Sequence, residues 1–374
     1  MVLALKELLY SKGRFIMIGF IIVLISWLVF ILSGLGTGLS ALSTGVVSQA
    51  DITGIVFEEG SEYSLSKSNI SSSLSEEVSK QEGVTDTAEI STFNTSVRKE
   101  GTANENEKIT DVVLIGIEPN SFMQPDIVEG STWNTSEQTQ VIADASLQSE
   151  GYSIGDSIEF SGTDKAVTIV GFTENKTLYH QSALYAQTDD FRDIRFSEPE
   201  LANGAEDSVS GIAIQGDEVN MAALSEPGSG IEYGTKEETI KAIPGYVAEN
   251  ATIMMMLWFL MIISAFILGV FFYVLTNQKT HQFGVLKAIG GSNGFIMRSV
   301  VSQVFVLSLI SILLGIGLTY LTVLALPETM PFQLETNMVV IYSAVLLVIS
   351  VLSSLFSVAR ISKIDPLTAL GRIE

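Results

Sequence analysis

Residues 251–276, ATIMMMLWFLMIISAFILGVFFYVLT, are 26 consecutive residues without a charge. Three similar uncharged runs occur in the chain, residues 15–35, 299–326 and 338–359, with 21, 28 and 22 residues. A helix of about 20 apolar residues is long enough to cross the hydrocarbon core of a bilayer. The four runs therefore predict four membrane-spanning helices, one before and three after a long polar segment.

The first run also has features of a signal peptide, because basic residues precede it. A signal peptide has an apolar core of only ~7–15 residues, which is shorter than this run. The three further runs also make a retained first span the more natural interpretation. We therefore expect the first helix to remain in the protein.

Charged residues are distributed unevenly along the chain. Residues 51–249 carry 37 acidic and 11 basic residues, a net charge of 11 − 37 = −26. The nine other basic residues lie before the first run, between the second and third, or after the fourth. Basic residues close to a span favour the cytoplasmic side. The sequence thus predicts a multi-pass membrane protein with cytosolic termini and a polar domain outside.

The polar segment has the size of one ordinary domain and contains no cysteine, so it must fold without disulfides. Short β-rich runs bounded by turn residues recur through it, such as GIVFEEG (54–60) and KAVTIVGFTE (165–174). Helices are expected at SSSLSEEVSKQ (71–81), where Ser73 is a candidate N-cap, and at TKEETIKAI (235–243). The fold class we expect is an α-helical membrane protein with four transmembrane helices and one α+β extracytoplasmic domain between the first and second spans.

The expected organisation follows the chain from a cytosolic amphipathic elbow to a cytosolic tail. Its parts are the elbow (1–14), the first transmembrane helix and stalk (15–49), the α+β domain (50–245), a stalk and the second transmembrane helix (246–276), a cytosolic loop (277–298), the third transmembrane helix (299–326), an outer loop (327–337), the fourth transmembrane helix (338–359) and the tail (360–374). The elbow either couples cytosolic events to the first span or is a plain topogenic anchor. Gly34, Gly36 and Gly38 either let helices approach closely or mark a loose exit from the bilayer.

Several motifs that carry chemistry are absent from the sequence. It contains no phosphate-binding loop, no Cys/His metal cluster, no HExxH and no GxSxG motif. None of the four runs contains Asp, Glu, Lys, Arg or His, whereas ion-coupled carriers usually place such groups at mid-membrane. We therefore expect neither an enzyme, nor a secondary transporter, nor a nucleic-acid partner. If the chain moves a substrate, a partner protein must supply the energy.

The loop NQKTHQFGVLKAIGGSNGFIMR (277–298) joins the second and third runs. It predicts about two helical turns from Gln282 to Ile289 and a break at Gly290 and Gly291. Phe283, Leu286 and Ile289 share one side of this helix, with Val285 nearby. Such a helix either docks in a groove of another protein or rests on lipid headgroups.

Two segments carry a family resemblance. FGVLKAIGGSNGFIM (283–297) resembles the coupling-helix segment of FtsX-like, macrolide-exporter-type ABC permeases, and RISKIDPLTALGRIE (360–374) resembles their closing segment. The order of one span, a large outside domain and three spans is also that of the family, so the resemblance covers nearly the whole chain. Gln282 stands where the family usually has Glu, which leaves the docking contact in place but weakens the case for a salt bridge.

The resemblance implies that the loop passes force from an ATPase to the membrane helices. The coupling residues that it implies are Gln282, Phe283, Gly284, Val285, Leu286, Lys287 and Ile289. It also implies two permease copies, favoured as a homodimer in the lipid bilayer, and two copies of a separate ABC ATP-binding subunit that holds the ATPase activity. Substrate would be taken from the membrane or the outer face.

The opening LALKELLYSKGRFIMIGFIIVLISWLVFILSGLGTGLS (3–40) and the overall size are similar to haem-exporting (HrtB-like) permeases of Gram-positive bacteria. This implies haem as a transported substrate, with no permanently bound cofactor. Candidate haem-binding residues near the two span exits are Glu58, Glu59, Tyr63, Met254, Met255, Met256, Trp27, Phe30 and Trp258, with Met255 and Glu58 as candidate iron ligands. His180 is a further conceivable ligand within LYHQSALY, which predicts a strand edge. The alternative for these residues is ordinary packing or solvation.

Three functions remain open at this point. The first is the permease of an ATP-driven exporter of an amphipathic toxic molecule, with haem favoured. The second is an exporter of antibiotic peptides or lipid-linked material on the same scaffold. The third is a non-transporting FtsX-like signalling subunit that controls an extracellular partner.

Overall fold

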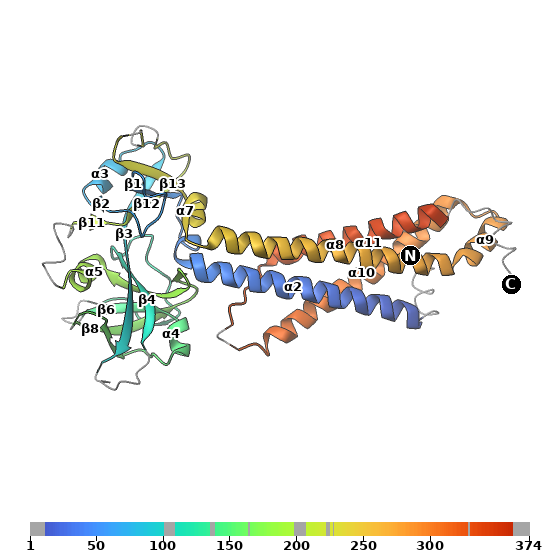
Figure 1. The fold of residues 1–374 in the computed structure, drawn as a ribbon, viewed down its shortest axis with the longest axis horizontal. Helices are drawn as coiled ribbons and strands as arrows, with labels where there is room; N and C mark the ends of the chain where they lie inside the picture. Colours follow the sequence, from blue (N-terminus) through green and yellow to red (C-terminus); the bar gives the residue numbers. More distant parts are fainter. Residues whose placement is uncertain are drawn as a thin grey trace. The chain divides into compact units, whose positions relative to one another are not determined.

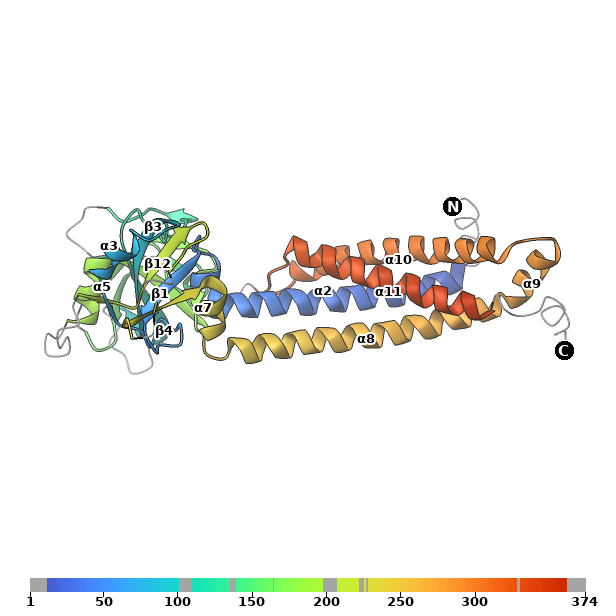
Figure 2. The same ribbon diagram turned by 90° about the horizontal axis from the view of Figure 1, so that it is seen from above.

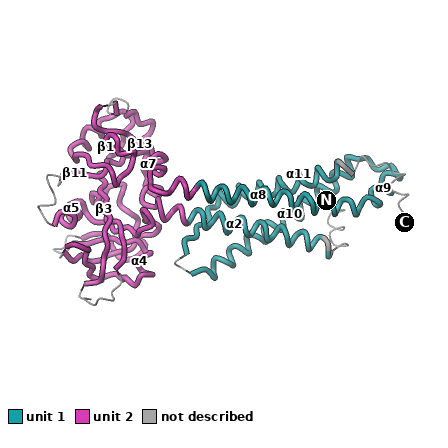
Figure 3. Tube along the Cα trace, viewed as in Figure 1, with its two compact units in different colours: residues 1–38, 251–374 teal, residues 39–250 magenta. Residues whose placement is uncertain are grey.

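The computed structural model describes residues 12–361 except 101–108, 135–138, 164, 198–206, 222–224, 227 and 328–329. The expected elbow before residue 12 and the family's closing segment after residue 361 lie outside the described residues. The chain divides into two compact units, one of residues 1–38 with 251–374 and one of residues 39–250 (Figure 3). We call the first the helical unit and the second the inserted domain.

Four long apolar helices make up the helical unit. They are α2 (Lys12–Ser48), α8 (Tyr246–Gln278), α10 (Asn293–Val323) and α11 (Thr336–Ile361). Each is long and apolar enough to cross a membrane, as the uncharged runs predict. Helices form there because, in hydrocarbon, every backbone N–H and C=O must find a partner within its own segment. The four helices run side by side in both views (Figures 1 and 2).

Small polar side chains lie between these helices. Ser26, Ser308 and Ser350 are fully buried, and Ser264 is 1% exposed. Serine hydroxyls in helices bond to carbonyls one turn back, as Ser264 Oγ does to Leu260 O at 2.6 Å. Small residues let helix backbones approach closely, which is the main source of packing energy where the surrounding lipid is also apolar.

The glycines in the C-terminal half of α2 are contact points. A side chain at Gly34 would collide with the Phe332 ring, and one at Gly38 with the backbone of Pro331. Gln333 N also donates to Gly34 O at 3.0 Å, which ties the connection between α10 and α11 to α2. Gly36 faces Ile253 in the same way. Of the two interpretations left open for this glycine run, the structure supports close approach.

The inserted domain contains thirteen described strands and four short helices. The strands are β1 (Gly54–Glu58), β2 (Ile70–Ser71), β3 (Val84–Lys99), β4 (Thr110–Ile117), β5 (Glu129–Gly130), β6 (Gln140–Asp144), β7 (Ser157–Phe160), β8 (Ala166–Thr173), β9 (Thr177–Leu178), β10 (Gln181–Gln187), β11 (Ser208–Val209), β12 (Gly211–Gly216) and β13 (Ile231–Thr235). The helices are α3 (Leu74–Val78), α4 (Ser146–Ser149), α5 (Thr188–Arg195) and α7 (Lys236–Ala242). The domain is therefore of the α+β class.

Strand pairing closes part of the sheet into a ring. β3 pairs with β4, β4 with β10, β10 with β6, β6 with β8, β8 with β7, and β7 returns to the far end of β3. The other half of β3 continues into the antiparallel order β3-β12-β1-β13. The long strand β3 therefore belongs to both parts of the domain and joins them.

The helix predictions in the inserted domain are confirmed, with one difference at a cap. Thr235 accepts a hydrogen bond from Glu238 N, and Glu238 reaches back to Thr235 N, which forms a complete capping box on α7. Ser73 occupies the N-cap position of α3, but its side chain makes no capping bond. Its hydroxyl lies 2.8 Å from Ser71 Oγ instead.

Candidate functional site

The short helix α9 (Thr280–Ala288) occupies the loop between α8 and α10. It ends where the sequence predicts a break, because Gly290 adopts a φ of +98°. Gly290 N donates to Lys287 O at 3.0 Å and Gly291 N to Leu286 O at 2.9 Å, which is the Schellman arrangement. Ser292 then caps α10 through Phe295 N. The turn between α9 and α10 is thus closely specified by hydrogen bonds.

The coupling residues implied by the family resemblance divide between two faces of α9. Gly284 is buried, and Phe283 packs against the core of the helical unit. Leu286 and Lys287 are half-buried. By contrast, Gln282 is exposed, and Val285 and Ile289 are 42% and 77% exposed. The second group therefore forms an apolar surface on the described part of α9 that another protein can contact.

A buried polar contact lies at the start of α9. Lys279 is only 7% exposed, and its Nζ atom lies 3.1 Å from Oε1 of Gln303 on α10. The same Nζ atom lies 5.1 Å from the centre of the Phe15 ring on α2. Sequence reasoning missed this contact, since a basic residue at the end of a span is expected in any cytosolic loop. The one available signal was an amide, Gln303, within an otherwise apolar run.

The methionine triplet on α8 is exposed within the helical unit. Met254, Met255 and Met256 are 42%, 53% and 42% exposed, and Trp258 is 68% exposed. Met255 and Trp258 are three residues apart, so they share one side of the helix. These side chains are accessible to a ligand in the bilayer or to a second protein.

The two aromatic candidates on α2 are engaged in packing. Phe30 is fully buried in the core of the helical unit. Trp27 is half-buried, and its Nε1 atom donates to Thr322 Oγ1 on α10 at 3.0 Å. In this arrangement neither ring is free to lie flat on a porphyrin without a change of packing.

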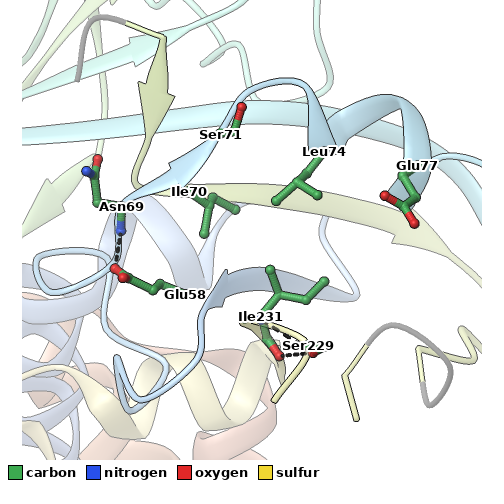
Figure 4. Close-up of a pocket in the computed structure, with 9 residues that line it drawn as sticks. Glu58, Asn69, Ile70, Ser71, Leu74, Glu77, Ser229 and Ile231 are labelled. Atoms are coloured by element: carbon green, nitrogen blue, oxygen red, sulfur yellow. Dashed lines mark hydrogen bonds between the residues drawn. The ribbon is translucent and has the colours of Figure 1, made fainter. Parts of the chain in front are cut away.

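Glu58 lines a pocket of about 490 Å³ in the inserted domain (Figure 4). The apolar part of the lining comes from Ile70, Leu74 and Ile231. Glu58 is exposed at the end of β1, and its Oε2 atom accepts a hydrogen bond from Asn69 N at 3.1 Å. One carboxylate oxygen of Glu58 is thus occupied by the adjacent backbone.

The two other domain candidates hold the chain in place. Glu59 accepts hydrogen bonds from Gly228 N at 2.9 Å and Gly230 N at 3.2 Å. Tyr63 packs against the inserted-domain core and meets Phe57 edge-to-face at 6.4 Å between ring centres. No group of three or more His, Cys, Asp or Glu residues within the described ranges is arranged to hold a metal ion.

His180 lies in the turn of the β9–β10 hairpin, not at the strand edge that the sequence predicts. It has a φ of +61°, and its N–H donates to Leu42 O on α2 at 3.1 Å. Its Nε2 atom lies 2.9 Å from Ser43 Oγ and 3.5 Å from Glu249 Oε2 at the start of α8. His180 thus joins α2, α8 and the hairpin within the inserted domain.

The neighbouring Tyr179 is largely buried, and this burial raises the pKa of its phenol.

The C-terminal part of the chain, which includes α9, matches a known protein family. Residues 254–366 match the model of the FtsX-like permease C-terminal family. This segment contains most of α8 and all of α9 and α10. This C-terminal segment is similar to an FtsX-like permease domain.

Relatives that match almost the whole chain are also described as permeases. The chain is 27% identical, over 369 residues, to a putative hemin transport system permease protein HrtB of Staphylococcus epidermidis, and covers 99% of both chains. It is 24% identical over 372 residues to the protein of that description from Staphylococcus haemolyticus, with 100% of this chain and 99% of the relative covered. These matches support an ABC permease.

Two solved structures resemble the inserted domain at low similarity. The extracellular domain of the noncanonic ABC-type transporter YknZ from Gram-positive bacteria has 13% identity and a TM-score of 0.34, covering 49% of this chain and 99% of that one. The periplasmic region of MacB from Actinobacillus actinomycetemcomitans has 14% identity and a TM-score of 0.36, covering 52% of this chain and 94% of that one.

The FtsX-like permease domain thus contains both the exposed surface of α9 and the buried contact beneath it. Its exposed side, at Val285 and Ile289, is open to another protein. Its inner side, at Phe283 and Lys279, is packed into the membrane helices.

Proposed function

We propose that this chain is the membrane-spanning permease subunit of an ATP-driven ABC efflux pump. The observation that carries the proposal is α9, a short helix in the FtsX-like permease domain that presents Val285 and Ile289 on one side and packs Phe283 on the other. The sequence contains no phosphate-binding loop. A separate ATP-binding subunit therefore docks on α9 and supplies the energy.

Charge gives the proposed orientation in the cell membrane. The basic residues outside the inserted domain support a cytosolic position for α9 and both termini, and an outside position for the domain of net charge −26. Two copies of the permease, as a homodimer, work with two copies of the ATPase. Closure of the ATPases on ATP moves the two α9 helices, and the spans carry this motion to the inserted domains.

Haem is the substrate that we favour. The relatives described as hemin transport permeases cover almost all of the chain, which supports this choice. On α8, Met255 supplies a thioether to iron, and Trp258 on the same side of the helix supplies a ring to the porphyrin face. Glu58, in its pocket of the inserted domain, is the alternative candidate for the iron ligand. Haem here is cargo, bound only in transit.

A haem titration of the purified full-length protein in detergent tests the substrate. We expect a saturable Soret shift at about one haem per two chains, and a loss of affinity of about tenfold for Met255→Leu, which corresponds to 1.4 kcal/mol. The matched control is Met330→Leu, a methionine that is 43% exposed in the connection between α10 and α11. It should titrate like the parent protein.

A second comparison separates the two candidate ligands. Glu58→Gln removes the carboxylate charge, and Glu77→Gln is its control because Glu77 lines the same pocket. No saturable shift for the parent protein would rule out haem. An exporter of antibiotic peptides or lipids would then become the leading form of the pump. An ATPase that is not stimulated by any substrate, together with a co-purifying extracellular protein, would instead indicate the signalling subunit.

A further inference from the structure

Lys279 is a buried cation that the proposed function does not yet use. It is the residue between α8 and α9, and it serves as the N-cap position of α9. Its backbone N–H donates to Thr276 O at 3.1 Å, and its carbonyl accepts from Phe283 N at 3.0 Å. The backbone of this single residue therefore joins the end of one helix to the first turn of the next.

The side chain of Lys279 extends into the helix bundle rather than into the cytosol. Lysines are rarely buried, and this one is only 7% exposed. Its Nζ atom donates to Gln303 Oε1 at 3.1 Å, and Gln303 is itself 2% exposed. The Phe15 ring, which is 3% exposed, faces the same Nζ atom from α2. Three helices thus converge on one ammonium group.

The fourth membrane helix, α11, is hydrogen-bonded to α8 close to Lys279. Ser357 Oγ of α11 donates to Phe272 O of α8 at 3.0 Å, and Thr276 Oγ1 donates to the same carbonyl at 2.6 Å. Phe272 and Thr276 lie within two turns of Lys279 on α8. A displacement of α9 at Lys279 therefore reaches α2 and α10 directly and α11 through α8.

We propose that Lys279 is a positioning residue that fastens α9 to α2 and α10, so that a displacement of α9 moves the membrane helices together. This inference rests on the proposed function, because it requires an ATPase that pushes α9. The hydrogen bond to a charged donor in a buried setting is of the stronger class, and a lost partner there is costly. Without this contact α9 would still bind the ATPase and stay packed through Phe283, but less of its displacement would reach α2 and α10.

The test uses the full-length permease, co-purified with its ATPase subunit and placed in lipid nanodiscs. The chain has no cysteine, so Val247→Cys provides a single site for an environment-sensitive fluorophore on the exposed first turn of α8. Emission is recorded before and after Mg-ATP. The variants on this background are Lys279→Met, Lys279→Arg and the double change Lys279→Met with Gln303→Leu. Arg298→Met is the control, because it removes an exposed positive charge from the first turns of α10.

For Lys279→Met we expect normal retention of the ATPase subunit and an unchanged KM for ATP, with the ATP-dependent emission change reduced about tenfold or more, as expected for the loss of a hydrogen bond to a charged group. Lys279→Arg should restore the signal, and Arg298→Met should match the parent. A normal signal in Lys279→Met would overturn the proposal. So would loss of the ATPase subunit from that variant, since Lys279 would then belong to the docking surface.

Two further measurements keep the test decisive. The double variant replaces both polar partners by apolar side chains and should fold even if Lys279→Met does not. In the unsubstituted protein, Lys279 should resist reductive methylation while the exposed Lys241 reacts, both with and without ATP. Equal reactivity of the two lysines would also overturn the proposal. If no ATPase subunit co-purifies with the parent chain, the proposed function fails first, and this inference fails with it.

Discussion

Individual carboxylates in the inserted domain hold the loop that follows β1 through hydrogen bonds. Glu232 Oε1 accepts hydrogen bonds from Ser61 Oγ and from Tyr63 N, both at 2.9 Å. Glu62 and Tyr63 adopt positive φ values of 57° and 59°, a conformation that side chains other than glycine rarely take. The strain in this turn is offset by the Glu232 contacts. Glu59 has a comparable role, since it holds the backbone at Gly228 and Gly230.

Replacement of Glu232 by Ala should therefore destabilise the inserted domain. We expect a loss of about 1–3 kcal/mol in the free energy of unfolding, because several donors lose their acceptor at once. Thermal unfolding of the full chain in detergent would measure this loss. The matched control is Glu237→Ala, whose carboxylate pairs with Lys241 on the surface of α7 and should change stability little. Equal effects of the two substitutions would contradict the role of Glu232.

At the scale of elements, the short helix α9 has one packed side and one exposed side. Its packed side includes Phe283 and Gly284, and its exposed side includes Val285 and Ile289. Sequence periodicity places Phe283 and Ile289 on one side, but the structure leaves Ile289 exposed at the C-cap and packs Phe283 inward. The difference arises because a nine-residue helix has few turns, and its junctions with α8 and α10 decide how it is rotated.

The exposed side of α9 should control docking of the ATPase. A charge placed at Val285 or Ile289 by substitution to Glu would be buried without a partner in the interface, and we expect retention of the ATPase subunit to fall by about tenfold or more. Co-purification and quantification of the subunit measure this. His281→Gln, an exposed change on the same helix, is the control. Unchanged retention in both Glu variants would place the docking surface elsewhere.

At the scale of the whole molecule, charge segregation accompanies the division into two units. The inserted domain contains the acidic excess, and the basic residues outside it lie at the ends of the apolar runs. Such an arrangement favours a single orientation in the membrane. A strongly negative domain outside would also repel anionic molecules, whereas a site within the membrane helices is partly shielded from that field.

The absence of cysteine makes this orientation directly measurable. In intact cells, an impermeant thiol reagent should label Glu62→Cys in the inserted domain and should not label Asn293→Cys at the start of α10. Both positions are exposed in the structure, so accessibility of the side chain does not explain a difference. Permeabilised cells provide the control, in which both variants should react. The reverse pattern in intact cells would invert the topology.

The sequence by itself determined the four apolar helices and the end of α9. Both depend on local properties, because a run such as residues 251–276 needs no distant partner to become a helix in a bilayer. The break at Gly290 likewise follows from the φ that glycine tolerates. The most regular strands of the inserted domain, such as β1 and β8, also show β-rich runs in the sequence.

Only the tertiary structure decided which candidates are accessible. Nothing local distinguishes Phe30, which is fully buried, from Trp258, which is 68% exposed, since both are aromatic residues in apolar helices. The long strand β3 is rich in polar residues, and it becomes a strand because partners distant in sequence pair with both of its halves. In the sequence, Lys279 is an ordinary basic residue. It contacts both α2 and α10 only because these helices pack around it. Burial and pairing of this kind are properties of the assembled helices and sheet, so they follow from packing over long sequence distances.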